Sequence, residues 1–216
     1  MKRQFSERCF GHEAMLNLPN ASLRKPLFQE SQSWATRASG RGLEASRMPK
    51  SEYVYATIAS PVGKLTLTAT GGGLTGISFE TSRRVRHAES AREDEADAVL
   101  RLATQQLQEY FAGERRTFDL PLAIEGTDFQ KRVWAELLRI PFGKTRSYGE
   151  MAMLLGDPKC TRAVGLANGS NPIAIVVPCH RVIGASGSLV GFGGGLRNKA
   201  LLLDLERGQP AFDFRS

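Results

Sequence analysis

The order of local sequence patterns along the chain constrains its fold more than any other feature. Three short segments rich in β-branched and aromatic residues come first, at 53–58, 64–69 and 74–79, with Pro61-Val62-Gly63 and Gly71-Gly72-Gly73 between them. Short runs of this kind, separated by turn residues, predict a three-stranded antiparallel meander.

One amphipathic helix is expected after this meander. Apolar side chains recur at helical spacing from Val99 to Phe111, and Gly113 supplies a stop signal. Three strands covered by one helix predict a small α/β domain.

Beyond Gly126 the pattern changes to short helices with strong N-terminal caps. Thr127 to Gln130 forms a capping box, and Pro141 ends the helix that this box begins. Ser147 to Glu150 forms a second capping box, which opens a helix that ends at Gly156. The C-terminal part is therefore expected to be mainly helical.

A third helix is expected from about Lys159 to Asn168, directly after a turn at Asp157-Pro158. Two short helices joined by a tight turn fit a helix-turn-helix, although two ordinary packing helices fit the spacing equally well. The second helix carries small residues such as Ala163 and Gly165, so it can approach a nucleic acid closely. Arg162 projects from its first turn.

Composition divides the chain of 216 residues into three parts. Residues 1–50 lack a sustained apolar period and are expected to form a disordered extension, unless Met48 is the natural start. Residues 51–125 form the expected α/β domain, with eight Lys or Arg against eleven Asp or Glu; residues 126–216 form the helical domain, with twelve against seven. The basic C-terminal part is compatible with nucleic acid binding, although many basic domains never contact DNA.

Several function classes are disfavoured by composition. No run approaches the roughly 20 apolar residues of a membrane span, and the N-terminus lacks the apolar core of a secretory signal. These features favour a cytoplasmic location, or a nuclear one in a eukaryote. The three cysteines lack short paired spacing, which disfavours a disulfide scaffold, and no Cys/His pair has metal-ligand spacing. We therefore expect no metal and no cofactor.

The strongest candidate for chemistry is Cys179. It follows the apolar run 172–177 and Pro178, which together predict an extended, buried segment that holds the cysteine rigidly. A free cysteine is more often an inert core residue. The neighbouring pair His180-Arg181 can nevertheless favour the thiolate, which is the nucleophilic form.

His180 is the expected general base. Because it is adjacent to Cys179 in sequence, a bridging water is the natural relay for the thiol proton. Such a histidine needs an acid to orient it. The last helix, expected from Leu196 to Arg207, offers both Asp204 and Glu206. Spacing alone leaves the choice between these two acids open.

The segment Pro178 to Val182 resembles the active-site signature of the O6-alkylguanine-DNA alkyltransferases, also called methylated-DNA–protein-cysteine methyltransferases. The similarity covers about residues 53–208. Its matching segments are Ser60 to Leu65, Pro141 to Tyr148, Arg162 to Gly165, Asn171-Pro172 and Gly191 to Gly195. The resemblance implies a ribonuclease-H-like α/β N-terminal domain, followed by a mainly helical C-terminal domain with a helix-turn-helix.

The resemblance also implies a mechanism. The helix-turn-helix would bind the minor groove of double-stranded DNA, and the damaged guanine would be flipped into a pocket. Cys179 would accept the alkyl group once per molecule, with His180 as the water-linked base. Glu206, rather than Asp204, matches the acid of the family, and Tyr148 matches a tyrosine that donates a hydrogen bond toward guanine N3.

Further residues are assigned to DNA and to the pocket by the same resemblance. Arg162 would fill the vacated base stack, the small residue Ala163 would let the helix approach, and Asn171 would tie the recognition helix to the active-site segment. The pocket positions are Pro178, Val182, Phe192 and Gly193. No cofactor and no obligate protein partner is implied, and a monomer that acts on O6-alkylguanine, and also on O4-alkylthymine, is expected.

Some positions depart from family variants. Residues 1–50 hold only Cys9, so the four-cysteine zinc domain of the adaptor form is not expected. Ala174, Val190 and Phe192 differ from some members near the pocket, which bears on the size of alkyl group accepted.

Three other functions compete with alkyl transfer. A non-catalytic alkylated-base-binding protein of the same fold would carry another residue at the position of Cys179. A plain helix-turn-helix regulator would not need a cysteine beside a histidine. A cysteine hydrolase would turn over repeatedly.

Overall fold

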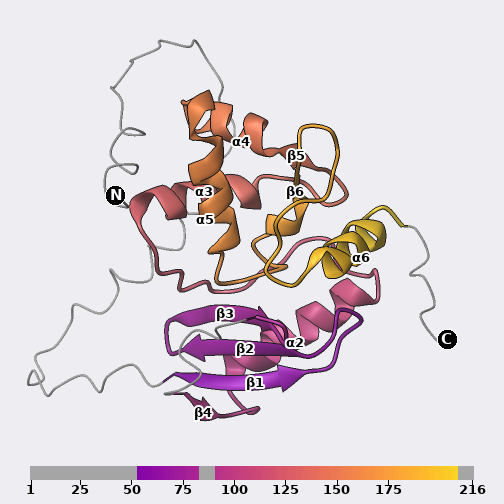
Figure 1. Cartoon of the computed structure of the whole chain (residues 1–216). Coiled ribbons are helices and arrows are strands. Elements are labelled where there is room, and N and C mark those ends of the chain that lie inside the picture. Colours follow the sequence, from indigo (N-terminus) through magenta and orange to yellow (C-terminus); the bar gives the residue numbers. More distant parts are fainter. Residues whose placement is uncertain (1–52, 83–90, 209–216) are drawn as a thin grey trace, which may run out of the picture. The chain divides into compact units, whose positions relative to one another are not determined.

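The computed structural model describes residues 53–82 and 91–208, so the expected extension at 1–50 lies outside the described residues. In chain order (Figure 1), the elements are β1 (Val54–Ile58), β2 (Leu65–Thr70), β3 (Gly73–Phe79), β4 (Arg92–Glu93), α2 (Ala98–Phe111), α3 (Asp128–Leu138), β5 (Arg146–Ser147), α4 (Tyr148–Leu154), η3 (Pro158–Cys160), α5 (Thr161–Gly169), η4 (Cys179–Arg181), β6 (Val182–Ile183) and α6 (Leu196–Glu206).

The predicted meander is confirmed. Strands β1, β2 and β3 pair antiparallel, and β4 adds in parallel to the free side of β1. The sequence did not predict β4, because its two residues are charged and exposed. The predicted helix is also present as α2, which lies along the sheet (Figure 1). The side chain of Asp97 caps it by accepting hydrogen bonds from the N–H groups of Val99 and Leu100.

The outer edge of β3 is paired with later segments of the chain. Leu74 N–H donates to Pro121 O at 2.8 Å, and Ile77 N–H donates to Pro172 O at 2.9 Å. Ile77 O in turn accepts a hydrogen bond from Ala174 N–H at 3.3 Å. The segment that leads to the candidate cysteine is therefore built on the edge of the sheet.

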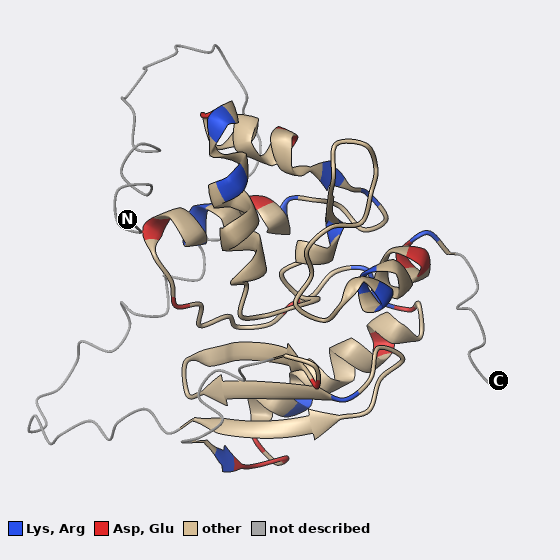
Figure 2. Ribbon diagram, in the orientation of Figure 1, with Lys and Arg blue, Asp and Glu red and all other residues tan. Residues whose placement is uncertain are grey.

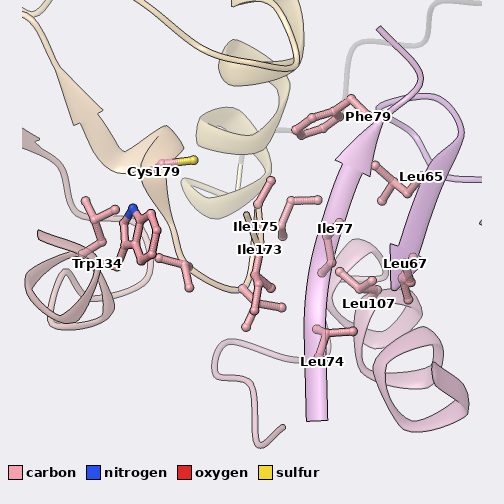
Figure 3. Close-up of a cluster of buried hydrophobic side chains, with 14 of the residues drawn as sticks. Leu65, Leu67, Leu74, Ile77, Phe79, Leu107, Trp134, Ile173, Ile175 and Cys179 are labelled. Atoms are coloured by element: carbon pink, nitrogen blue, oxygen red, sulfur yellow. The ribbon is translucent and has the colours of Figure 1, made fainter. Parts of the chain in front are cut away.

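One apolar core joins the sheet to the helical part. Figure 3 shows Ile77 of β3 close to Ile173 and Ile175 of the later segment, with Leu67 of β2 on one side of them and Trp134 of α3 on the other. All five side chains are at most 2% exposed. The candidate cysteine lies at the border of this cluster (Figure 3).

The helical part follows the predicted caps. Both capping boxes are present, at the starts of α3 and α4. The third predicted helix begins as the 3-10 turn η3 and continues as α5. Trp134 Nε1 donates to Ala167 O at 2.9 Å and so ties α3 to α5.

The predicted domain boundaries, 51–125 and 126–216, stay predictions. Within residues 53–82 and 91–208, no helix has both the length and the apolar character needed to cross a membrane.

Candidate active site

The segment that carries Cys179 is not extended, so that expectation is wrong. Ile175 has a φ of 74°, and Pro178, with φ −81° and ψ 64°, closes an inverse γ-turn. In this turn Cys179 N–H donates to Val177 O at 2.8 Å. A non-glycine residue at positive φ costs on the order of 1 to 3 kcal/mol. The hydrogen bonds to the sheet edge and to neighbouring side chains hold the chain in this conformation.

Asn171 supplies the side-chain part of this support. Its Nδ2 donates to Val177 O at 2.7 Å, and its Oδ1 accepts a hydrogen bond from Ile173 N–H at 3.1 Å. Asn171 comes directly after α5 and its C-cap Ser170. The residue therefore lies between α5 and the active-site segment.

Cys179 is 5% exposed and is the free cysteine of the described residues. Burial raises the pKa of its thiol, and this effect outweighs the lowering influence of the Asn171 side chain and the Lys199 ammonium. The expectation that the surroundings favour the thiolate is therefore wrong for the resting protein. A base has to remove the thiol proton when the cysteine reacts. Cys160, the other described cysteine, is also buried.

His180 is fully buried and suited to act as that base. Its Nε2 lies 2.8 Å from Glu206 Oε1, and its Nδ1 has no hydrogen-bond partner among the described residues. A carboxylate only accepts, so Nε2 bears the hydrogen and Nδ1 carries the lone pair. Burial lowers the pKa of His180 against the raising influence of Glu206. The imidazole is thus neutral at rest and able to accept a proton.

Glu206, and not Asp204, is the acid that contacts His180. Besides His180, the Glu206 carboxylate accepts hydrogen bonds from Tyr110 Oη, Gly143 N–H and the Arg181 guanidinium, at 2.8 to 3.0 Å for the shortest contact of each. Burial alone would raise its pKa, but the bonds from His180 and Arg181 lower it to about 2. Glu206 therefore stays ionised. Asp204 instead pairs with Arg207 at the surface, at 3.8 Å.

Two buried polar residues of this site were missed from the sequence, namely Tyr110 and Lys199, and Arg181 was named as a neighbour of Cys179 but not as a partner of Glu206. Lys199 Nζ donates to Val182 O at 2.6 Å and to Val190 O at 2.7 Å, and burial lowers its pKa. A sequence signal for Lys199 existed. It lies seven positions before Glu206, and the two share the buried face of α6 with Leu202 and Leu203.

Tyr148 begins α4 and lies near the active-site segment. Its hydroxyl is 3.5 Å from the carbonyls of Val190 and Gly191, and it accepts a hydrogen bond from Asn168 Nδ2 at 3.3 Å. The same amide nitrogen lies 3.4 Å from Cys179 O. Burial raises the pKa of Tyr148, so the phenol keeps its proton and remains a donor.

The predicted pocket residues differ in their surroundings. Pro178 and Val182 are buried, whereas Gly193 is exposed. Phe192 is half-buried and meets the ring of Phe79 edge-on, with centroids 5.3 Å apart. Phe192 therefore also packs against the sheet.

One face of α5, the helix that comes before the Cys179 segment in the chain, is open to solvent. Arg162 is exposed and Ala163 is half-buried. Leu166, one helical turn after Arg162, is 72% exposed, an unusual position for a leucine. Figure 2 shows further basic positions on α3 and around α5. This face combines positive charge with an exposed apolar side chain.

No set of three or more His, Cys, Asp and Glu side chains that could hold a metal ion occurs in the described part of the chain. The polar atoms of the site are suited to proton transfer and hydrogen bonding. What they can do chemically is activate one buried thiol beside a neutral imidazole.

Comparison with known proteins defines the class. Residues 53–124 match the ribonuclease-like domain of 6-O-methylguanine DNA methyltransferase, and residues 128–208 match its DNA binding domain. The chain belongs to the 6-O-methylguanine DNA methyltransferase family.

The similarity to known proteins covers almost the whole length of those proteins. A methylated-DNA–protein-cysteine methyltransferase of Mycobacterium tuberculosis strain H37Rv is 51% identical over 164 residues, which are 74% of this chain and 95% of the relative. One from Methanosarcina acetivorans is 50% identical over 153 residues, covering 70% and 97%. A crystal structure of Mycobacterium tuberculosis OGT in complex with DNA matches with a TM-score of 0.67 at 52% identity, covering 73% of this chain and 96% of that one.

Proposed function

We propose that this protein repairs DNA directly, by moving the alkyl group of O6-alkylguanine onto Cys179 Sγ. The observation that supports this most is the buried series Cys179, His180 and Glu206, in which His180 Nδ1 has no hydrogen-bond partner among the residues that the structure describes. It occurs in a chain whose relatives are named methylated-DNA–protein-cysteine methyltransferases.

In the proposed reaction, a water relays the thiol proton of Cys179 to His180 Nδ1. The sulfur attacks the alkyl carbon, an S–C bond forms, and the C–O6 bond breaks with its electron pair left on guanine. Tyr148 donates a hydrogen bond toward guanine N3 and stabilises the charge that develops there. Glu206, held as an anion, stabilises the imidazolium. A thioether has no easy hydrolytic exit, so one alkyl group per protein is the limit.

We further propose that α4 and α5, joined by η3, form a helix-turn-helix that binds double-stranded DNA in the minor groove. Arg162 would occupy the gap that the flipped guanine leaves, with Ala163 close to the backbone and Asn171 holding α5 to the active-site segment. Pro178, Val182, Phe192 and Gly193 would line the base pocket. The exposed side chains of Arg162 and Leu166 on α5 support this assignment.

The protein is proposed to act as a monomer, in the cytoplasm or in the nucleus if the source is eukaryotic, without a cofactor or an obligate protein partner. Residues 51–125 and 126–216 are its proposed domains.

Mass spectrometry after incubation with duplex DNA that carries O6-methylguanine tests the function. We expect one methyl group per protein, and peptide mapping should place it on Cys179. Cys179→Ser is the control and should stay unmodified. Repeated turnover, a methyl group on Cys160, or reversible lesion binding without modification would each overturn the proposal, the last in favour of a non-catalytic base-binding protein.

A further inference from the structure

We propose that Tyr110, on α2 of the small α/β part, is a positioning residue for alkyl transfer that acts through Glu206. This proposal rests on the proposed function. It means that the α/β part contributes a hydroxyl group to the chemical site as well as a packing surface.

The geometry is specific. Tyr110 Oη donates to Glu206 Oε1 at 2.9 Å, and the same oxygen lies 2.8 Å from His180 Nε2. Tyr110 and His180 are both 0% exposed, and Tyr110 is 96 positions away from Glu206 in sequence. Burial and the adjacent carboxylate raise the pKa of Tyr110 well above its usual value, so the hydroxyl remains a donor throughout the working pH range.

Packing alone does not require this hydroxyl. The ring of Tyr110 contacts the rings of Phe111, Phe118 and Phe142, with centroids 5.4 to 6.1 Å apart. A phenylalanine would make the same ring contacts. A buried hydroxyl is costly unless it is hydrogen-bonded, and here its acceptor is the carboxylate that orients the base.

The hydroxyl has a chemical consequence for His180. Tyr110 and Arg181 both donate to Glu206 Oε1, so they withdraw electron density from the oxygen that faces the imidazole. A carboxylate with fewer competing donors would bind the imidazolium more strongly and raise the pKa of His180. The other charged or titratable groups around the imidazole, Arg181, Lys199 and Cys179, all remain present in a variant that lacks the hydroxyl. Tyr110 therefore helps to keep His180 neutral before it accepts the thiol proton.

The test is Tyr110→Phe in the full chain, with the single-turnover transfer rate measured across pH. The acid limb of the profile should move to higher pH by about half a unit to one unit, as expected for one hydrogen bond. Below that limb the rate should fall about three- to tenfold, while DNA affinity stays the same. Tyr55→Phe, which removes a phenol from β1 of the same part, is the matched control and should leave the profile unchanged.

A purely structural role predicts another result. Tyr110→Phe would then lower the rate by the same factor at every pH, or lower only the melting temperature, and either outcome would overturn the proposal. If the variant does not fold, a ring-fluorinated tyrosine at position 110 keeps the packing and strengthens the donor. The limb should then move to lower pH, and an unmoved limb would also overturn the proposal. Methyl transfer to Cys179 by the unmodified protein tests the proposed function separately.

Discussion

The exposed face of α5 and the buried site around Cys179 are built in opposite ways. On α5, Arg162 and Leu166 extend into water. At the site, the side chains of His180 and Glu206 are 0% exposed, and both Glu206 oxygens accept hydrogen bonds. A surface that meets a partner can leave its side chains solvated, whereas a buried carboxylate needs donors to remain charged. Binding and chemistry should therefore respond to different substitutions.

The largest effect is expected from Glu206→Gln. The amide has no negative charge to stabilise the His180 imidazolium, and its NH2 group opposes the Arg181 guanidinium. We expect the single-turnover transfer rate to fall by about 100-fold or more, with duplex affinity changed by no more than about twofold. Asp204→Asn removes the same charge from the exposed face of α6 and is the control. Equal losses of DNA binding and of transfer rate would contradict the view that the buried site serves the chemistry and the α5 face serves binding.

A large effect on stability is expected at acid pH. The pKa of Glu206 is about 2 in the folded protein, against 4.5 as its ordinary value. A carboxylate with a depressed pKa stabilises the fold above its unfolded pKa and loses that contribution as pH falls to the folded pKa. The advantage of the native protein over Glu206→Gln should shrink by up to about 3 kcal/mol between pH of about 5 and about 2. Chemical denaturation at several pH values measures this difference, and a constant difference would contradict it.

A smaller effect is expected from Arg162, and it should be confined to duplex DNA. Arg162→Ala should slow repair of duplex DNA by about tenfold, because extruding a base costs a few kcal/mol and the vacated stack would be left unfilled. Arg162→Lys should recover part of that loss, since an ammonium cannot stack as a guanidinium does. Reaction with free O6-methylguanine should be nearly unchanged in both variants.

The exposed Lys131 of α3 gives a matched control for charge. Lys131→Ala should weaken DNA binding only slightly. Full recovery of the duplex rate by Arg162→Lys would make Arg162 a phosphate anchor. A loss of reaction with the free base would place Arg162 in the chemical site.

The smallest effect is expected from removing residues 1–47. These residues carry eight Lys or Arg against four Asp or Glu. A chain that begins at Met48 should transfer methyl at a normal rate at saturating DNA, with a somewhat shallower dependence of affinity on salt. An insoluble or inactive shortened chain would contradict this expectation.

Local features of the structure were predictable from the sequence. The capping boxes at Thr127 and Ser147 could be predicted, because a capping box depends on residues only three positions apart. The conformation of the segment before Cys179 could not be predicted, since this segment, with Ile175 at positive φ, is hydrogen-bonded to Ile77, which is distant in sequence. An apolar run is predicted to be extended when the residues that it forms hydrogen bonds with are unknown.

The candidate site divides in the same way. Cys179, His180 and Glu206 could be named from motif and family pattern, and their geometry supports the roles proposed for them. Tyr110 could not, because its contact with Glu206 spans 96 positions and nothing in the sequence of α2 distinguishes it from an ordinary core tyrosine. The raised pKa of Cys179 could not be predicted from the sequence either, since the burial that raises it depends on the complete fold.

The pairing at the two borders of the sheet bears on whether another chain can add a strand to it. An open strand edge is a template for aggregation with other chains. Here the outer side of β3 is already bonded to the segments around Pro121 and Pro172, and the opposite border is β4, a strand of two charged, exposed residues. The described sheet therefore offers no long apolar strand to a second molecule. The hydrogen bonds that fix the reactive segment also keep this sheet from growing.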